Sequence, residues 1–256
     1  MNVLEKVNPV VRLIAVILLT TPLLFSVDVV SAAVCLAFVV ALAPLCGVGL
    51  VQLAKTAWPV FAVLPVAGLS MALYGKRGGH EYFSFFYAHV TDNSLMLAAA
   101  IMVRMLAVSL PVIIVARTLD STRLGDGLAQ VLHFPARFVI GAVSAVRMVG
   151  LFRRDWQALG RARRSRGLAN DGRIFRAFTM VFALLVLALR RADKLAMAMD
   201  ARGFGAPGKR TWARPSTVGM SDVAAVCVAI AVAAISIAVA VVTGSYDFLN
   251  LGSSSA

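Results

Sequence analysis

Charged residues are scarce in this 256-residue sequence: they make up 14%, against roughly a quarter in soluble domains. Their scarcity leaves four long charge-free runs and a fifth that contains only Arg104: 13–27, 29–54, 56–75, 223–246 and 93–116. A helix of ~20 apolar residues crosses a bilayer core, so these lengths predict membrane spans. With 60% hydrophobic residues, an ordinary soluble enzyme is excluded. The alternation of barrel strands is also lacking, which indicates an all-α, polytopic membrane protein.

Cysteine is rare as well. Cys35, Cys46 and Cys227 fall within or at the edges of apolar runs and show no Cys-x-x-Cys or metal-ligand spacing. We therefore expect them to serve as small apolar residues, with no metal site. We also recognise no small-residue cleavage site in the first apolar run, which predicts a retained first helix and not a removed signal peptide.

Positive charge is plentiful in one segment only. Residues 117–214 hold 19 of the 25 Lys and Arg and 6 of the 12 acidic residues, so the whole net charge of +13 falls there. Basic segments beside membrane spans are retained in the cytoplasm during insertion. This predicts a cell-membrane protein with a cytoplasmic basic segment, and it makes nucleic-acid binding a weak interpretation. Contact of the arginines with anionic lipid headgroups would explain part of the charge.

Turns and polar stretches divide the apolar sequence into about five predicted transmembrane helices: 10–27, 29–45, 50–74, 94–116 and 219–244. We expect three parts: four transmembrane helices in 1–116, a cytoplasmic region of amphipathic helices in 117–215, and a last span with an external tail in 216–256. Alternation of the spans places the amino terminus in the cytoplasm and the carboxyl terminus outside.

Two helices are predicted within the basic segment. The first, 141–166, has apolar residues near a period of 3.6: Met148, Leu151, Phe152, Leu159 and Ala162. The apolar stretch 177–189 would reach only about 20 Å at ~1.5 Å per residue, which is too short to span a bilayer. We predict a buried or membrane-edge helix there.

The pattern Ala-x-x-small-Arg-Gly occurs twice, 36 residues apart. It comprises Ala162, Ser165, Arg166 and Gly167, and again Ala198, Ala201, Arg202 and Gly203. In each copy Ala and Arg are four apart, so they share one helical face that a partner can approach closely. The Gly is expected to end the helix as a left-handed cap. A plain helix terminus would explain one copy, but two matched copies favour a docking motif.

Residues 203–209 match the first seven positions of a nucleotide-binding P-loop, but the eighth is Arg210. A P-loop needs Ser or Thr there to hold Mg²⁺, and it should follow a buried strand. This run follows a predicted helix instead. We therefore predict a loop without a nucleotide site.

Arg104 lies about midway along its predicted span, where a charge indicates a function by default. Arg104 would anchor a partner subunit or a helix break, or else it would pair with backbone carbonyls inside the bundle. We favour the pairing with backbone carbonyls.

Four candidate metal ligands lie in the external polar stretch: His80, Glu81, His89 and Asp92. Their spacing fits no compact site, so a solvated loop is predicted there.

The sequence resembles the EcfT family, the transmembrane T component of energy-coupling factor transporters, which are related to ABC transporters. The likeness rests on the two Arg-Gly motifs, the run Arg190-Arg191-Ala-Asp-Lys-Leu-Ala before the second one, residues 118–128 followed by His133-Phe134-Pro135, and the opening Asn8-Pro9 with Arg12. It covers nearly the whole chain. The family usually has Asp and a basic residue where this chain has Asn8 and Val10, and often Thr-Thr where it has Arg117-Thr118.

This resemblance implies a non-catalytic scaffold with two long, crossing coupling helices. Arg166 would dock into one of two ABC-type ATPase subunits and Arg202 into the other. Ser165, Gly167, Ala201 and Gly203 would permit the close approach. The membrane helices would hold a small S subunit that binds a vitamin or metal ion. ATP and Mg²⁺ would be used by the ATPases, and this chain would bind no cofactor.

Two other classes of protein were compared with this interpretation. A stand-alone secondary transporter would show paired membrane repeats, broken helices or intramembrane carboxylates. The one repeat that we recognise lies in the basic segment, and we expect no acidic residue in any span. An integral membrane enzyme acting on lipid phosphates would need clustered carboxylates or histidines at the membrane face. The six acidic residues of the basic segment show no such spacing.

Overall fold

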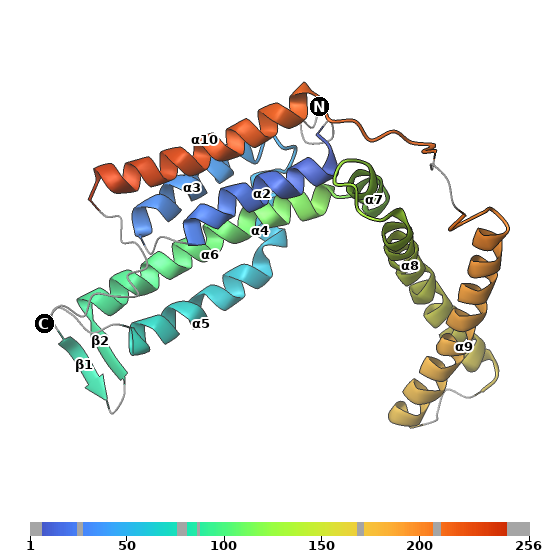
Figure 1. Cartoon of the computed structure of the whole chain (residues 1–256). Coiled ribbons are helices and arrows are strands. Elements are labelled where there is room, and N and C mark those ends of the chain that lie inside the picture. Colours follow the sequence, from blue (N-terminus) through green and yellow to red (C-terminus); the bar gives the residue numbers. More distant parts are fainter. Residues whose placement is uncertain are drawn as a thin grey trace, which may run out of the picture. The chain divides into compact units, whose positions relative to one another are not determined.

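The computed structural model describes residues 7–24, 28–75, 81–85, 88–167, 172–206 and 211–244, and their regular secondary structure is helical apart from one hairpin (Figure 1). The chain divides into two compact units. The membrane unit is Met1–Asp120 with Thr217–Ala256, and the basic unit is Ser121–Ser216.

The described residues of the membrane unit form six helices and the hairpin. The helices are α2 (Pro9–Leu24), α3 (Val29–Leu42), α4 (Leu50–Thr56), α5 (Trp58–Tyr74), α6 (Asp92–Thr118) and α10 (Met220–Val242). The strands are β1 (Glu81–Phe85) and β2 (Ala88–Thr91), which pair antiparallel. They lie in the polar stretch for which only a loop was predicted. A capping box between Thr91 and Ser94 then starts α6.

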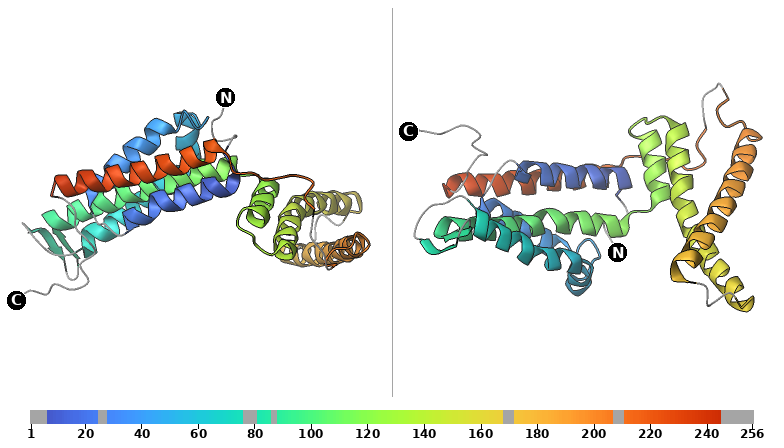
Figure 2. Two further views of the ribbon diagram at one scale, coloured as in Figure 1. Left: turned by 45° about the horizontal axis from the view of Figure 1, so that its top comes forward. Right: turned by 90° about the horizontal axis from the view of Figure 1, so that it is seen from below.

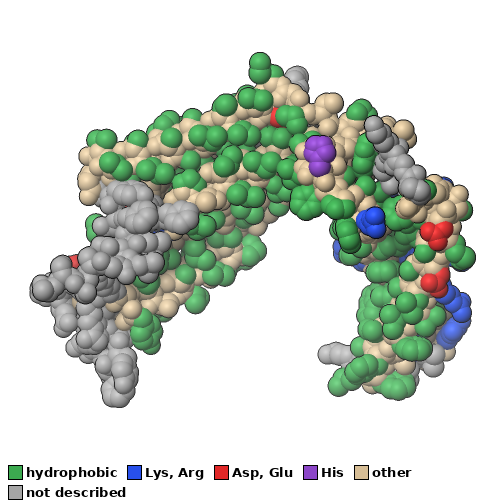
Figure 3. Space-filling view, viewed as in Figure 1, with side chains coloured by type: hydrophobic (Ala, Val, Ile, Leu, Met, Phe, Trp, Pro, Cys, Tyr) green, Lys and Arg blue, Asp and Glu red, His purple; other side chains and the backbone are tan. Residues whose placement is uncertain are grey.

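All five predicted apolar segments are helical. Among the described residues, α6 and α10 are long and apolar enough to cross a membrane, and α4 with α5 makes a third crossing if the bent pair is one span. The shorter apolar helices are α2, with 16 residues, and α3, with 14. Hydrophobic side chains cover the visible face of this unit (Figure 3).

The third predicted span is broken, whereas the sequence had indicated one continuous helix. The axes of α4 and α5 meet at 61°. Pro59 lies in the first turn of α5, where it cannot donate a backbone hydrogen bond to the preceding turn, and its ring disfavours a continuous helix. The bend therefore falls at Ala57, just before that proline.

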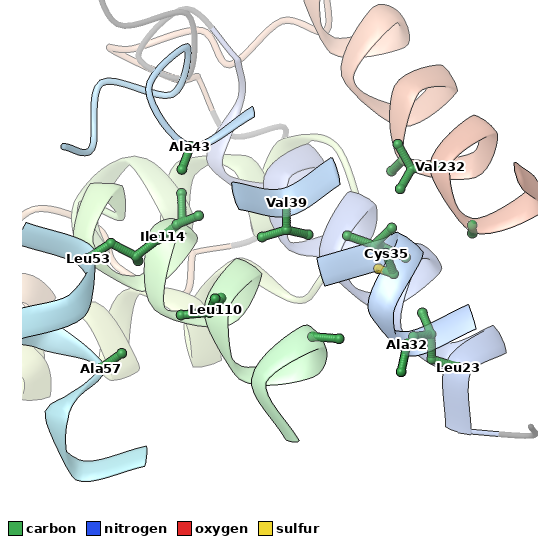
Figure 4. Close-up of a cluster of buried hydrophobic side chains, with 14 of the residues drawn as sticks. Leu23, Ala32, Cys35, Val39, Ala43, Leu53, Ala57, Leu110, Ile114 and Val232 are labelled. Atoms are coloured by element: carbon green, nitrogen blue, oxygen red, sulfur yellow. The ribbon is translucent and has the colours of Figure 1, made fainter. Parts of the chain in front are cut away.

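Small side chains let the helices of the membrane unit pack closely. Cys35 and Val39 of α3 belong to one buried cluster with Leu110 of α6 and Val232 of α10 (Figure 4), and Cys35 is fully buried. Many of the other buried residues in this cluster are alanines: Ala32, Ala43, Ala57, Ala107, Ala229 and Ala233. In lipid, close approach of backbones and van der Waals contact hold helices together.

The basic unit contains α7 (Ser121–Gln130), α8 (Ala136–Ser165) and α9 (Arg173–Asp200), and α8 crosses α9 (Figures 1 and 2). The stretch 177–189 is the middle of the 28-residue α9 and not a separate short helix. It is also not buried in this chain, because Phe178 is 71% and Phe182 68% exposed while Met180 is buried. Arginine is a good helix former, so the charges that bound the stretch do not end the helix.

Candidate functional site

The first Arg-Gly motif forms the carboxyl end of α8. Arg166 N–H donates to Arg163 O at 3.2 Å, and Gly167 N–H donates to Arg164 O at 3.2 Å. Gly167 has φ +73°, in the left-handed region that favours glycine. Ser165 Oγ donates to Ala162 O at 2.9 Å, which satisfies one carbonyl of the last turn.

The second motif forms the carboxyl end of α9 in the same way. Gly203 has φ +72°, and its N–H donates to Asp200 O at 2.9 Å. Phe204 N–H donates to Met199 O at 3.0 Å, which completes a Schellman turn. The expectation that a left-handed glycine ends both helices is confirmed.

Both motif arginines are exposed, as are Ala162 and Ala198. Within the described residues, neither Arg166 nor Arg202 has a side-chain hydrogen bond or ion pair. Each guanidinium is therefore accessible at a helix end, followed by a glycine that adds no bulk.

Two polar contacts hold α8 and α9 at their crossing. Arg191 Nη1 donates to Asp155 Oδ2 at 2.7 Å, and Arg163 Nη1 donates to Thr179 Oγ1 at 2.8 Å. Between these contacts, Gly160 lies next to the buried Met180. Residues late in α8 thus contact residues early in α9, so the two helices run in opposite directions.

The crossing places the two motifs on opposite sides. At ~1.5 Å per residue, Arg166 lies about 9 Å beyond Gly160 along α8, and Arg202 lies about 33 Å beyond Met180 along α9. The two arginines therefore cannot share one docking site.

A polar cluster at one end of the membrane unit was not predicted as a site. Arg12 is 4% exposed, and its guanidinium donates hydrogen bonds to backbone carbonyls. Its Nε and Nη2 donate to Val7 O at 2.9 and 2.7 Å, and its Nη1 donates to Thr118 O at 3.0 Å. Arg12 thus ties the start of α2 to the end of α6.

Asp222 completes this cluster, and it contradicts the expectation that no acidic residue lies in a span. It is 3% exposed in the first turn of α10. Its carboxylate accepts hydrogen bonds from Asn8 N–H at 2.5 Å and Gly219 N–H at 2.7 Å. Asn8 Nδ2 also donates to Thr217 O at 3.5 Å. We call Asn8, Arg12 and Asp222 the polar clamp.

The polar clamp fastens both places where the chain passes between the units, Thr118 at the end of α6 and Thr217 before α10. The opening Asn8-Pro9 with Arg12 was noted only as part of a resemblance. The sequence signal for its partner was a single acidic residue, Asp222, next to a long charge-free run.

Arg104 is half-buried in α6, and its Nη2 atom has neither solvent contact nor a hydrogen-bond partner. Arg104 belongs to the membrane unit, and the Arg-Gly motifs belong to the basic unit. Its predicted role as an S-subunit anchor or structural residue stays a prediction.

The P-loop-like run begins in the turn after α9, where Gly205 also has a positive φ of 89°, and residues 207–210 lie outside the described residues. A helix, and not a strand, precedes it.

Of the candidate metal ligands, His80 lies outside the described residues, and only the backbone of Glu81 and His89 is described. No group of three or more potential metal ligands occurs among the residues that could be searched.

Comparison with known proteins links these features to one family. The profile of the family described as "Cobalt transport protein" (CbiQ) matches residues 1–212. The chain is similar to three proteins named energy-coupling factor transporter transmembrane protein EcfT. It is 26% identical to that of Limosilactobacillus fermentum over 186 residues, covering 65% of this chain and 70% of the relative.

The other two similarities extend further along the chain. The chain is 24% identical to the Brevibacillus brevis protein over 213 residues, covering 78% of this chain and 80% of the relative. It is 22% identical to the Streptococcus equi subsp. equi protein over 248 residues, covering 90% and 89%. The similarity therefore includes both the apolar helices and the Arg-Gly motifs.

Proposed function

Because this chain belongs to the CbiQ family of cobalt transport proteins, we propose that it is the transmembrane, energy-coupling component of an energy-coupling factor transporter. The observation that carries the proposal is the pair of exposed Arg-Gly helix ends on the crossed helices of a basic unit. The protein is a non-catalytic subunit: ATP hydrolysis belongs to partner chains, which use ATP and Mg²⁺.

The partners at the two helix ends are two ABC-type ATPase subunits. Arg166 docks into one of them and Arg202 into the other, and each pairs with acidic groups through its planar, multi-donor guanidinium. Three features support this assignment: both arginines are exposed, both precede a left-handed glycine, and the crossing separates them too far for one site.

A third partner is a small membrane S subunit that binds the transported vitamin or metal ion. The membrane unit holds it beside the bilayer-crossing helices. The basic unit lies in the cytoplasm with the amino terminus, and the carboxyl terminus lies outside. The concentration of Lys and Arg in residues 117–214 supports this orientation.

The polar clamp gives this arrangement a route for coupling. ATP binding and hydrolysis bring the ATPases together and apart, which moves the ends of α8 and α9. Movement of the basic unit reaches the membrane unit through its two chain connections, and both are fastened by Asn8, Arg12 and Asp222. Because these hydrogen bonds hold both connections, a displacement of the basic unit is passed on to α2, α6 and α10 and is not lost in a flexible linker.

The proposal is tested by the variants Arg166→Ala and Arg202→Ala. In the free chain both arginines are exposed, so each change costs only a helix-dipole contribution of ~0.3–1 kcal/mol. In the docked complex, truncation strands a buried partner charge and costs about 2–5 kcal/mol, or roughly 30-fold or more in affinity. We therefore expect normal expression, weaker co-purification of the ATPases and reduced uptake, with the double variant worse than either single variant.

Matched controls are Arg153→Ala on α8 and Arg190→Ala on α9, which remove exposed arginines outside the motifs. They should bind the ATPases at full yield. Arg166→Lys and Arg202→Lys should rescue poorly because Lys lacks the planar fork. A double alanine variant that co-purified fully with its ATPases and transported normally would show that the docking assignment is wrong.

A further inference from the structure

A cavity of about 260 Å³ opens at the crossing of α8 and α9. Gly160 and Met180 form its floor, because an added β-carbon at Gly160 would lie 3.8 Å from Met180 Cε and 3.9 Å from Arg164 Nη1. Arg161 and Arg164 line it from α8 and Arg176 lines it from α9.

The three arginines of this cavity lack acidic partners among the described residues. The nearby carboxylate of Asp155 already accepts a hydrogen bond from Arg191 on the other side of the crossing. Arg161 and Arg164 are three residues apart, where like charges on a helix repel each other, and Arg176 adds a third positive charge. An anion in the cavity removes this repulsion and gains charge-assisted hydrogen bonds.

The lining favours a phosphate group over a simple inorganic ion. Guanidinium forks match the oxygens of phosphate, and Trp156, which is 38% exposed, places an indole ring at the same cavity. Tryptophan is enriched at the level of lipid headgroups. Within one turn of Arg176, α9 also exposes Ile174, Phe175 and Phe178, at 75%, 66% and 71%. Arginines beside apolar side chains on one helix are typical of a membrane interface.

We propose that this cavity binds the phosphate group of an anionic membrane phospholipid, held by Arg161, Arg164 and Arg176 with Trp156 beside it. Such a site fixes the crossing of α8 and α9 at the membrane surface. Arg164 lies within the first Arg-Gly motif, but the docking residues Arg166 and Arg202 do not line the cavity, and the proposal does not depend on their docking to ATPases.

The experiment uses the full chain with Trp58→Phe and Trp212→Phe, so that Trp156 is its only tryptophan. It is reconstituted in mixed vesicles of phosphatidylglycerol and phosphatidylcholine, with bromine on the acyl chains of one lipid or the other at equal mole fraction. Brominated phosphatidylglycerol should quench Trp156 more strongly than brominated phosphatidylcholine. Each arginine removed should weaken this preference about fivefold.

Two kinds of variant separate the cavity from general charge attraction. The triple variant Arg161→Gln, Arg164→Gln, Arg176→Gln should lose the preference. The control triple Arg147→Gln, Arg153→Gln, Arg190→Gln removes the same charge from exposed positions outside the cavity and should keep it. Gly160→Leu fills the floor without changing any charge, and it should weaken the preference even if the triple variant folds poorly.

Three results would overturn the proposal. Equal quenching by both lipids in the otherwise unaltered chain is expected if the cavity instead receives an acidic protein segment. Equal loss in both triple variants would indicate unspecific attraction to the anionic surface. Loss of quenching on addition of inorganic phosphate at matched ionic strength would indicate a site for the free anion. Quenching that is retained after this addition supports a phospholipid, and not free phosphate, as the ligand.

Discussion

At the residue scale, Asp222 connects two segments that are far apart in the sequence. Its two carboxylate oxygens accept hydrogen bonds from Asn8 N–H and Gly219 N–H in a site that is almost closed to solvent. An Asn side chain has one acceptor oxygen and an NH₂ group that only donates. With Asn at this position, one of the two backbone donors loses its acceptor.

We therefore expect Asp222→Asn to lower the free energy of unfolding by about 1–3 kcal/mol, the cost of one unsatisfied buried donor. The measurement is the apparent Tm of the purified chain in mild detergent. Asp193→Asn makes the same chemical change at an exposed position on α9 and should leave Tm nearly unchanged. Equal Tm values for the two variants would argue against the polar clamp.

Sequence reasoning at this scale succeeded where the determinant was local. A left-handed glycine after an amphipathic helix is encoded within a few residues, so Gly167 and Gly203 were predicted correctly. The polar clamp depends on a contact between Asn8 and a residue 214 positions later. No periodicity or spacing in one sequence can identify such a pair, so the contacts of Arg12 and Asp222 were not predicted.

At the element scale, apolar length predicted where helices occur but not where they break or continue. The Trp58-Pro59 step divides the third segment into α4 and α5, although its composition is apolar throughout. Conversely, α9 continues through arginines that had been taken as the ends of a short helix. Backbone chemistry at Pro59 and the high helix propensity of arginine decided these boundaries, whereas hydropathy did not.

The contact between α7 and α8 depends on a glycine without a side chain. A β-carbon on Gly125 of α7 would overlap Val143 Cγ2 of α8, so Gly125→Ala forces these helices apart. We expect this variant to destabilise their packing by about 1–3 kcal/mol. Hydrogen exchange measured by mass spectrometry should become faster in α7.

Gly141→Ala on α8 is the matched control, because its β-carbon would meet nothing within 4 Å. It should slow exchange in α8 or leave it unchanged, since alanine in a helix is more stable than glycine by roughly 0.5–1 kcal/mol. Faster exchange in both variants would mean that the close approach at Gly125 does not determine the α7–α8 packing.

At the scale of the whole molecule, the uneven distribution of charge makes a prediction about orientation. In a chain without its native cysteines, Ser254→Cys should react with a membrane-impermeant thiol reagent in intact cells, and Asn170→Cys should react only after the membrane is permeabilised. Both positions lie outside the described residues. Labelling of Asn170→Cys in intact cells would contradict a cytoplasmic basic unit.

The polar clamp also has a consequence for the biosynthesis of the chain. Asn8 is synthesised 209 residues before Thr217 and 214 residues before Asp222. At about 5–20 residues per second, Asn8 is therefore synthesised roughly 10–40 seconds before these two partners. A nascent or truncated chain without α10 therefore lacks the Asp222 carboxylate that accepts the hydrogen bond from Asn8 N–H. Completion of the cluster thus marks the stage of synthesis at which α10 has joined α2.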